Sequence, residues 1–311
     1  MALIRSKPKK LELLDPQTLA RIGGLELVSR TVVDGVMSGM HRSTHKGGCC
    51  DFDEHRAYSQ GDDLRLIDWR LLARSDRYYI KQFEDETNLH AWLVLDTSGS
   101  MQFGQSTMSK FDYARMTAAC LARLLLKQRD SIGLLTGSGS TRTVVPPRPQ
   151  ASHFMSIIDQ LQTLRADGAA QLHDAVTDVR SVLKRRSLVI VFSDCFGDLE
   201  ELGHSLQQLR LRGHDVLVIQ VLAPEEISFS FRNPSIFEDL EASSTRLNVH
   251  PGTIRKHYLE QFESFMHRLH EKMVEIDCEF VTLSTDRNLG DSLAYYLRRR
   301  AARRRVQGAS A

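Results

Sequence analysis

The sequence predicts an α/β protein built on a mostly parallel, doubly wound sheet. Short apolar runs with the length of buried strands alternate with longer stretches in which apolar residues recur at helical spacing. Strands that alternate with helices are joined by crossover connections, and such connections build parallel sheets. The 311 residues are 41% hydrophobic and 26% charged, an ordinary globular composition for one large domain with additions or for two smaller ones.

The first 87 residues are predicted to form an N-terminal extension that packs on the main domain. Apolar residues recur at roughly helical spacing over residues 11–40, with Asp15-Pro16 as a helix start, which predicts that this segment is helical. Residues 41–60 are polar with little periodicity, and residues 64–73 are short and helical in pattern. Residues 78–86 alternate in character as a strand does.

A regular alternation of strand and helix patterns defines the predicted main domain, residues 88–300. Its predicted strands cover residues 89–95, 131–136, 141–145, 187–192, 215–222 and 279–283. Its predicted helices cover residues 108–128, 153–164, 172–184, 199–210, 254–275 and 289–300. The Gly-Ser string at residues 137–140 separates two of the strands and predicts a hairpin. Residues 301–311 are predicted to be an Arg-rich tail.

Charge and cysteine content limit the classes of protein to which the chain can belong. The formal net charge is only +2, which points neither to nucleic acid nor away from it. No apolar run approaches the roughly 20 residues that cross a bilayer, and Met1–Lys10 lacks the apolar stretch of a secretory signal. The five cysteines are odd in number and form no Cys-x-x-Cys motif, as expected of reduced thiols. We therefore expect a cytoplasmic protein with no membrane span.

Polar side chains follow two of the predicted buried strands. Asp96, Ser98 and Ser100 lie in a Gly-containing turn after the first strand of the main domain, and Asp194 follows a later strand. In open parallel sheets, ligands bind outside the carboxyl ends of the strands, where the strand order reverses. Mg²⁺ prefers oxygen ligands in a near-octahedral shell, which hydroxyls and carboxylates supply. The alternative interpretation is that these residues only cap helices and form turns.

The turn at Asp96 resembles a known metal site. The string LVLDTSGSM, Leu93–Met101, resembles the metal-ion-dependent adhesion site of von Willebrand factor A domains. The chain is also similar to one bacterial family, domain of unknown function 58, which carries a degenerate form of that domain. The motifs that carry this likeness are Gly39-x-His41-x-Ser43, Glu54-x-Arg56-x-Tyr58, Gly61-Asp62-Asp63-x-Arg65-x-Ile67-Asp68-Trp69, Ala73-Arg74 and Val281-x-Leu283-Ser284-Thr285-Asp286. The resemblance spans roughly residues 35–300 and implies a doubly wound sheet of the von Willebrand factor A type.

The resemblance also implies roles for the polar residues and a kind of partner. Ser98 and Ser100 would be direct ligands of Mg²⁺, Asp96 and Asp194 would act through water, and a carboxylate of a partner would complete the shell. Members of this family resemble partners of MoxR-type AAA+ ATPases in the maturation or remodelling of other proteins. We therefore expect a protein-binding module rather than an enzyme.

One departure from the A-domain pattern concerns the second metal-binding loop. In A domains a threonine of this loop coordinates the metal, and the corresponding position here is Ala170, which offers no side-chain oxygen. Asp167, Gln171 or water would have to take its place. The resemblance thus implies a degenerate metal site.

Two other functions remain open at the same position. Asp96-Thr97-Ser98 after an apolar strand also resembles the nucleophile loop of haloacid-dehalogenase-type phosphatases. That chemistry needs a second aspartate two residues after the nucleophile, and Ser98 stands there instead. The other function is a purely structural A-like domain without a functional metal.

Two charged clusters have simpler structural explanations, and a third cluster has the residue types of a zinc site but not the spacing of one. The charged string that ends at Trp69 is expected to fix the extension against the main domain through an internal charge network. The six arginines within residues 298–305 are expected to form a solvated helix end, so nucleic acid is not an expected partner. A zinc-type cluster matches no common finger spacing and consists of His41, His45, Cys49, Cys50 and His55.

Overall fold

A computed structural model of the chain separates it into two compact units. One unit consists of residues 1–39 together with 89–311, and the other of residues 40–88. In the smaller unit, strand β1 (His55–Ala57) pairs antiparallel with β2 (Tyr79–Lys81), which lies inside the predicted strand over residues 78–86. The structure describes residues 24–43, 55–57, 72, 74, 78–81, 89–104, 108–137, 142–166, 172–231, 233, 235–238, 240, 246–291, 293–294 and 297.

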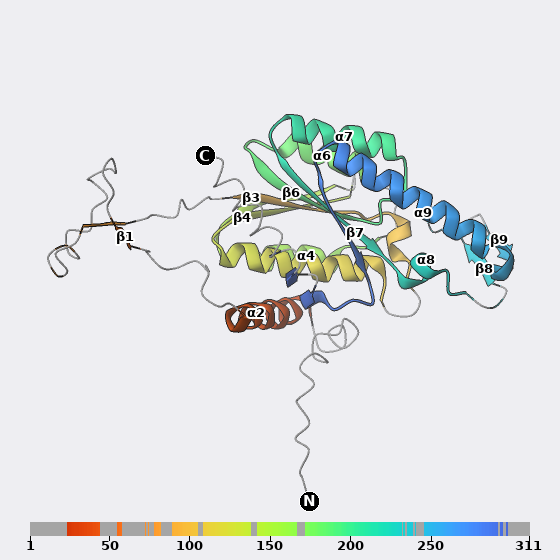
Figure 1. The fold of residues 1–311 in the computed structure, drawn as a ribbon, viewed down its shortest axis with the longest axis horizontal. Coiled ribbons are helices and arrows are strands. Elements are labelled where there is room, and N and C mark those ends of the chain that lie inside the picture. The colour runs from red at the N-terminus through yellow and green to blue at the C-terminus, as the bar shows by residue number, and fades with distance from the viewer. Residues whose placement is uncertain are drawn as a thin grey trace, which may run out of the picture. The chain divides into compact units, whose positions relative to one another are not determined.

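The larger unit is built on a six-stranded sheet with the order β10-β7-β6-β3-β4-β5 (Figure 1). Neighbouring strands are parallel except for β4 and β5, which form the predicted antiparallel hairpin. The predicted α/β class and mostly parallel sheet are therefore confirmed. The strands are β3 (His90–Leu95), β4 (Ser131–Thr136), β5 (Thr143–Arg148), β6 (Ser187–Ser193), β7 (Asp215–Leu222) and β10 (Glu279–Ser284).

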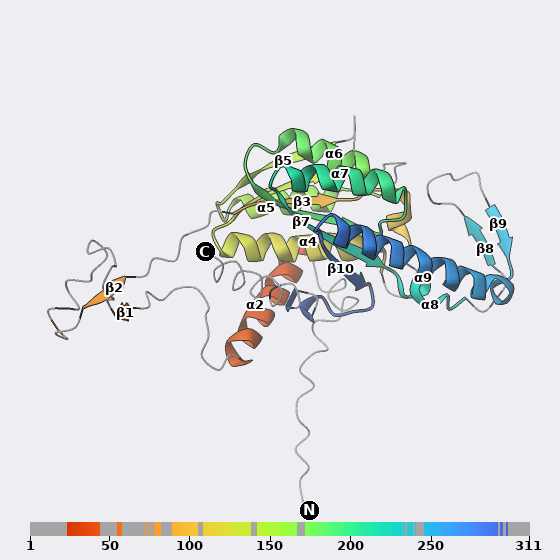
Figure 2. The same cartoon turned by 45° about the horizontal axis from the view of Figure 1, so that its top comes forward.

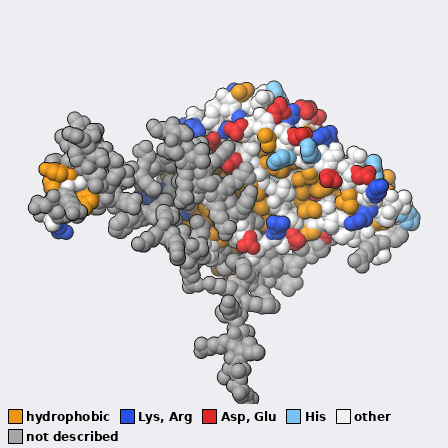
Figure 3. Space-filling view, viewed as in Figure 1, with side chains coloured by type: hydrophobic (Ala, Val, Ile, Leu, Met, Phe, Trp, Pro, Cys, Tyr) orange, Lys and Arg blue, Asp and Glu red, His pale blue; other side chains and the backbone are white. Residues whose placement is uncertain are grey.

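The central strands are apolar on both faces because helices cover both faces of the sheet. On one face α6 (Leu172–Val182), α7 (Leu199–Leu211) and α9 (Pro251–Glu275) enclose an apolar core with alternate residues of the strands. The core residues of this face include Trp92, Val94, Val189, Val191, Val218, Val176, Leu206 and Leu269. In the space-filling view the described acidic and basic side chains on the visible surface are intermixed (Figure 3).

The other face is covered by α4 (Lys110–Lys127), with α5 (His153–Thr163) beside it. Of the 18 residues of α4, 14 are buried, since this helix lies between the sheet and further helices. Helix α2 (Leu25–Ser43) buries four valines at helical spacing, and its Asp34 forms an ion pair of 2.5 Å with Lys127 at the end of α4. The described part of the predicted N-terminal helix is thus helical and contacts the sheet domain through α4.

Residues 224–249, for which no element is predicted, contain a short helix and a hairpin. Helix α8 (Pro224–Ser228) follows β7, and β8 (Ser235–Glu238) pairs antiparallel with β9 (Arg246–Val249) beyond the first turns of α9 (Figure 2). An aromatic cluster that includes Phe229, Phe237 and Tyr258 joins these elements. Helix α8 and strands β8 and β9 are too short to show a periodic pattern of apolar residues in the sequence.

Helix α9 begins at Pro251, three residues before the predicted start, because proline is favoured in the first turn of a helix. Among the described residues, Cys120, Cys195 and Cys278 are buried free thiols. Within the described residues, no helix is both long and apolar enough to cross a membrane.

Candidate functional site

The candidate site lies where the order of the strands reverses. The chain passes from β3 to β4 on one side, and later returns to place β6 on the other side of β3. Strands β3 and β6 run parallel, with Leu95 opposite Phe192, so their carboxyl ends lie next to each other. Asp96 directly follows β3 and Asp194 directly follows β6. Sheets of this kind bind ligands at such a point.

The loop after β3 folds around the Asp96 carboxylate. Asp96 Oδ1 accepts a hydrogen bond of 2.9 Å from the backbone N–H of Ser98. The hydroxyls of Ser98 and Ser100 then face each other, with their oxygen atoms 3.1 Å apart. Asp96 and Ser98 are buried, whereas Ser100 is half-buried at the start of the short helix η3 (Gly99–Gln102). The loop therefore presents its hydroxyls at the outer side of a buried carboxylate.

The loop after β6 holds the same carboxylate from the other side. Ser193 donates a hydrogen bond of 2.5 Å from its hydroxyl to Asp96 Oδ2, and its oxygen accepts one of 2.9 Å from Cys195 N–H. Cys195 has a φ of 60°, a left-handed conformation that a non-glycine residue rarely adopts. Asp194 Oδ1 accepts from Phe196 N–H at 3.0 Å. The sharp turn at Cys195 thus allows two side chains of this loop to accept bonds from its own backbone.

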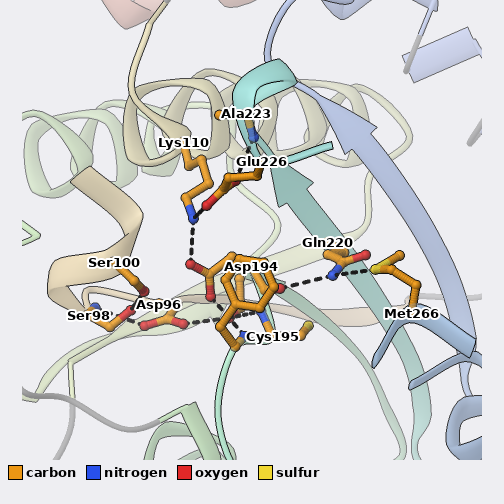
Figure 4. Close-up of polar contacts among 12 residues, drawn as sticks. Asp96, Ser98, Ser100, Lys110, Asp194, Cys195, Gln220, Ala223, Glu226 and Met266 are labelled. Atoms are coloured by element: carbon orange, nitrogen blue, oxygen red, sulfur yellow. Dashed lines mark hydrogen bonds and ion pairs between the residues drawn. The ribbon is translucent and has the colours of Figure 1, made fainter. Parts of the chain in front are cut away.

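A buried lysine completes the site. Lys110 is the first residue of α4 and is only 1% exposed. Its ammonium donates to Asp194 Oδ2 at 2.7 Å and to Glu226 Oε1 at 2.6 Å, as Figure 4 shows. The ring of Phe196 lies with its centroid 5.1 Å from Lys110 Nζ, and the ring of Phe103 at 5.8 Å. Neither Lys110 nor Glu226 is among the site residues predicted from the sequence.

Further hydrogen bonds fix the residues that surround Asp194 and Glu226. Gln220 on β7 donates to the backbone oxygen of Asp194 at 3.0 Å and accepts from the hydroxyl of Thr282 on β10 at 3.0 Å. Glu226 Oε2 accepts from Ala223 N–H at 2.8 Å, and the backbone oxygen of Glu226 accepts from the Tyr258 hydroxyl at 2.9 Å. The carboxylates of the site are therefore held by β6, β7, α8 and α9 together.

The site carries more negative than positive charge. Burial raises the pKa of Asp96 to about 6, and the neighbouring Asp194 carboxylate adds to the rise. Burial also raises the pKa of Glu226, although the Lys110 ammonium opposes the rise. The pKa of the Cys195 thiol is raised well above its usual value, again mainly by burial. Cys195 is consequently a neutral thiol and not a nucleophile.

The structure brings together all four residues of the predicted metal site. Asp96, Ser98, Ser100 and Asp194 lie around one point at the switch in strand order. Asp198, which also follows β6, lies apart from them in its contacts: its exposed carboxylate caps α7 by accepting from Glu200 and Glu201 N–H. The capping interpretation thus holds for this aspartate.

Several predicted features lie outside the described residues. They include the loop of Asp167, Ala170 and Gln171, the string that ends at Trp69, and the Arg-rich tail. Of the zinc-type cluster, only His41 and His55 fall within described elements, α2 and β1, and their side chains are not described. These expectations stay predictions.

The donor atoms around Asp96 fit a hard divalent cation. Two adjacent ligands of an octahedral Mg²⁺ ion lie about 3.0 Å apart, which is close to the 3.1 Å between the oxygen atoms of Ser98 and Ser100. The same spacing serves a hydrogen bond between the two hydroxyls. Among the described residues, no group of three His, Cys, Asp or Glu side chains is placed to hold a metal ion. From the described residues, a cation here would take the two hydroxyls and water as ligands.

Comparisons with known proteins place the chain in a family. The model of the family described as "Protein of unknown function DUF58" matches residues 54–268. "Uncharacterized protein Mb1516" of Mycobacterium bovis is 29% identical over 235 residues, which are 75% of this chain and 74% of that protein.

Solved structures with a similar arrangement include BatB from Bacteroides thetaiotaomicron and the SpRpn10 VWA domain. BatB is 13% identical with a TM-score of 0.42, covering 69% of this chain and 99% of its own. The SpRpn10 domain is 13% identical with a TM-score of 0.39, covering 65% and 92%. Both TM-scores lie below 0.5, so the α/β architecture is assigned from the strand order of this chain and not from these two structures.

Proposed function

Since the chain belongs to the family described as "Protein of unknown function DUF58", we propose that it is a protein-binding module whose binding surface lies at the carboxyl ends of β3 and β6. One observation carries this proposal: Asp96, Ser98, Ser100 and Asp194 meet at the switch in strand order. The half-buried Ser100 and the exposed side chain of Phe196 border this point and are available to a partner. An aromatic side chain beside buried polar groups is typical of an interaction surface.

The proposed partner is a MoxR-type AAA+ ATPase, and the proposed process is the maturation or remodelling of other proteins. The motifs Gly61–Trp69 and Leu93–Met101, which resemble those of family members associated with such ATPases, support this proposal. The match of the family model over residues 54–268 covers both motifs.

The proposed cofactor is Mg²⁺, bound weakly. Ser98 and Ser100 would hold the ion directly, and Asp96 and Asp194 would hold it through water. A bound Mg²⁺ would accept a carboxylate of the partner as its last ligand. The spacing of the two hydroxyls and the raised pKa of Asp96 support the position, because a cation beside this buried carboxylate would relieve its charge.

A phosphatase that uses Asp96 as nucleophile is less well supported by the geometry. Both carboxylate oxygens of Asp96 already accept hydrogen bonds, from Ser98 N–H and from the Ser193 hydroxyl. The residue two positions later is Ser98, which cannot act as the general acid–base of that reaction. Hydrolysis of an aryl phosphate that is lost on Asp96→Asn would favour the phosphatase over the binding module.

The proposal is tested by binding of the purified chain to a purified MoxR-type ATPase. We expect saturable binding that weakens at least about tenfold, or about 1.4 kcal/mol, when Ser98 and Ser100 are both replaced by alanine. Chelation of Mg²⁺ should weaken the binding of the parent chain and leave that of the double variant unchanged. Ser156→Ala, at an exposed position of α5, is the matched control and should bind as the parent does. Equal binding by the double variant and the parent would place the surface elsewhere.

A further inference from the structure

Among the lysines whose side-chain burial the structure describes, Lys110 is the only one that is buried, and it is held by two acids. Its ammonium lies 2.7 Å from Asp194 Oδ2 and 2.6 Å from Glu226 Oε1, and the side chains of Lys110 and Asp194 are each 1% exposed. Lysine is almost never fully buried unless it is paired, since an isolated ammonium loses its hydration. The pairing with two carboxylates therefore explains how the lysine is tolerated here.

Lys110 lies at an end of α4 where a positive charge is electrostatically unfavourable. As the first residue of α4, after the cap at Ser109, Lys110 places a positive charge at the positive end of the helix dipole. A cation is disfavoured there, and an anion is favoured. Such a violation of a local rule is expected at a site where the residue serves a function, with the cost offset by its partners.

The charges of the site show what the ammonium does. Asp96, Asp194 and Glu226 contribute three carboxylates, and among the described residues Lys110 is the ammonium that contacts two of them. In Figure 4, the ammonium and the hydroxyls of Ser98 and Ser100 approach the two aspartates from different sides. Lys110 thus neutralises the aspartate after β6, whereas the described donors to the aspartate after β3 are neutral.

We infer that Lys110 is a resident cation that sets the metal affinity of the site: its ammonium occupies the charge-balancing position at Asp194 and thereby keeps the binding of divalent cations weak. The inference rests on the proposed cation position at Ser98 and Ser100. A divalent ion bound there would be repelled by the ammonium, and would find Asp194 already engaged by it. Lys110 is therefore a specificity-determining residue: its ammonium balances the charge of Asp194, and a divalent cation is not needed to do so.

The test measures binding of Mn²⁺ to the full chain by electron paramagnetic resonance, and of Mg²⁺ by calorimetry. Lys110→Met keeps a long apolar side chain and removes the charge, and we expect it to bind either ion at least about tenfold more tightly than the parent. The matched control is Lys127→Met, the same substitution at the exposed last residue of the same helix, which should bind as weakly as the parent. The double variant Lys110→Met/Asp194→Asn should also return to the weak binding of the parent.

Glu226→Gln provides a variant that retains the ammonium and removes little packing. It leaves Lys110 with Asp194 as its charged partner, so we expect Mn²⁺ to bind no more tightly than to the parent. This variant and the parent keep the inference testable if Lys110→Met does not fold. Tighter binding by Glu226→Gln, or a micromolar Kd for Mg²⁺ on the parent, would overturn the inference.

The remaining outcomes separate this inference from the proposed function. A folded Lys110→Met variant with the metal affinity of the parent overturns the role of Lys110, even if the ATPase still binds through Ser98 and Ser100. A gain in metal affinity for Lys110→Met that the double variant abolishes supports that role, even if no ATPase binds. Equal gains for the single and the double variant would also overturn it, because the effect would then not pass through Asp194.

Discussion

Two aspartates occupy equivalent places after adjacent parallel strands, and the protein treats them differently. Asp194, after β6, forms a buried ion pair with Lys110. Among the described residues, the donors that contact Asp96, after β3, are neutral groups of Ser98 and Ser193, and the pKa of Asp96 is raised to about 6. The two aspartates therefore have different roles, one in the stability of the fold and the other in the proposed binding of a cation. The balanced charge at Asp194 holds α4, β6 and α8 together, and the unbalanced charge at Asp96 lies beside the hydroxyls that a cation would use.

The largest expected effect comes from removing the ammonium at the balanced strand end. Lys110→Met should lower the free energy of unfolding by about 3–5 kcal/mol, because two buried carboxylates lose their cation. Urea denaturation in chelator measures the change. Lys127→Met on the exposed end of α4 should cost no more than about 1 kcal/mol. Equal losses for the two variants would mean that the Asp194 end is no more stabilising than a surface pair.

Asp96→Asn should have the opposite sign. The pKa of Asp96 is raised from 3.8 to about 6, so the folded chain binds this proton more readily than the unfolded chain, and the ionised carboxylate opposes folding above pH 6. We expect the variant to be more stable than the parent by about 1–3 kcal/mol at pH 7.5 in chelator, with the gain disappearing toward pH 4. Unfolding measured at both pH values checks this. A loss of stability at pH 7.5 would show that the charge of Asp96 is already balanced.

Asp198→Ala probes a third carboxylate that follows the same strand as Asp194. Its carboxylate contacts the backbone N–H groups of Glu200 and Glu201 at the start of α7, so the variant should lose about 1 kcal/mol of stability. Binding of Mn²⁺ to this variant should equal that of the parent. Weaker binding of the ion would extend the site beyond the two aspartates that face each other.

The smallest effect concerns the opposite, amino end of β6. There the Nδ1 atom of His214 accepts from Ser187 N–H at 3.3 Å, and burial lowers the pKa of His214. The lowered pKa means that stability is lost as the pH falls below about 6.5, the reverse of the effect of Asp96. His214→Asn should reduce this loss by less than about 1 kcal/mol between pH 7.5 and 5.5. His257→Asn, at an exposed position of α9, should leave the pH dependence unchanged.

The fold could be predicted where the pattern is local and repeated. Strand β7 has the predicted bounds, and the aspartates that mark the site directly follow β3 and β6. A parallel arrangement then brings the two aspartates together, because adjacent strand ends meet at one edge of the sheet. The segment of α8, β8 and β9 could not be predicted in the same way, since elements of four or five residues show no periodicity.

The charge balance of the site could not be predicted from the sequence. In the sequence, Lys110 is a single lysine at the start of a helix, which is usually a solvated position. Its acidic partners are 84 and 116 residues further along the chain, and no local pattern links them. A signal is nevertheless present, because lysine at the first position of a helix opposes the helix dipole. The same signal also occurs at many exposed helix starts, and only burial distinguishes them.

The distances along the chain that separate Lys110 from its two acids govern when the site can form during folding. Asp194 and Glu226 lie 84 and 116 residues after the lysine, so the ion pairs close very long loops and must form after most local structure. A nascent chain that has emerged through the loop after β6 would have Asp194 for this ammonium, and would still lack Glu226. The strand-end surface is therefore completed only after α8 has emerged, which ties its appearance to nearly complete synthesis of the sheet.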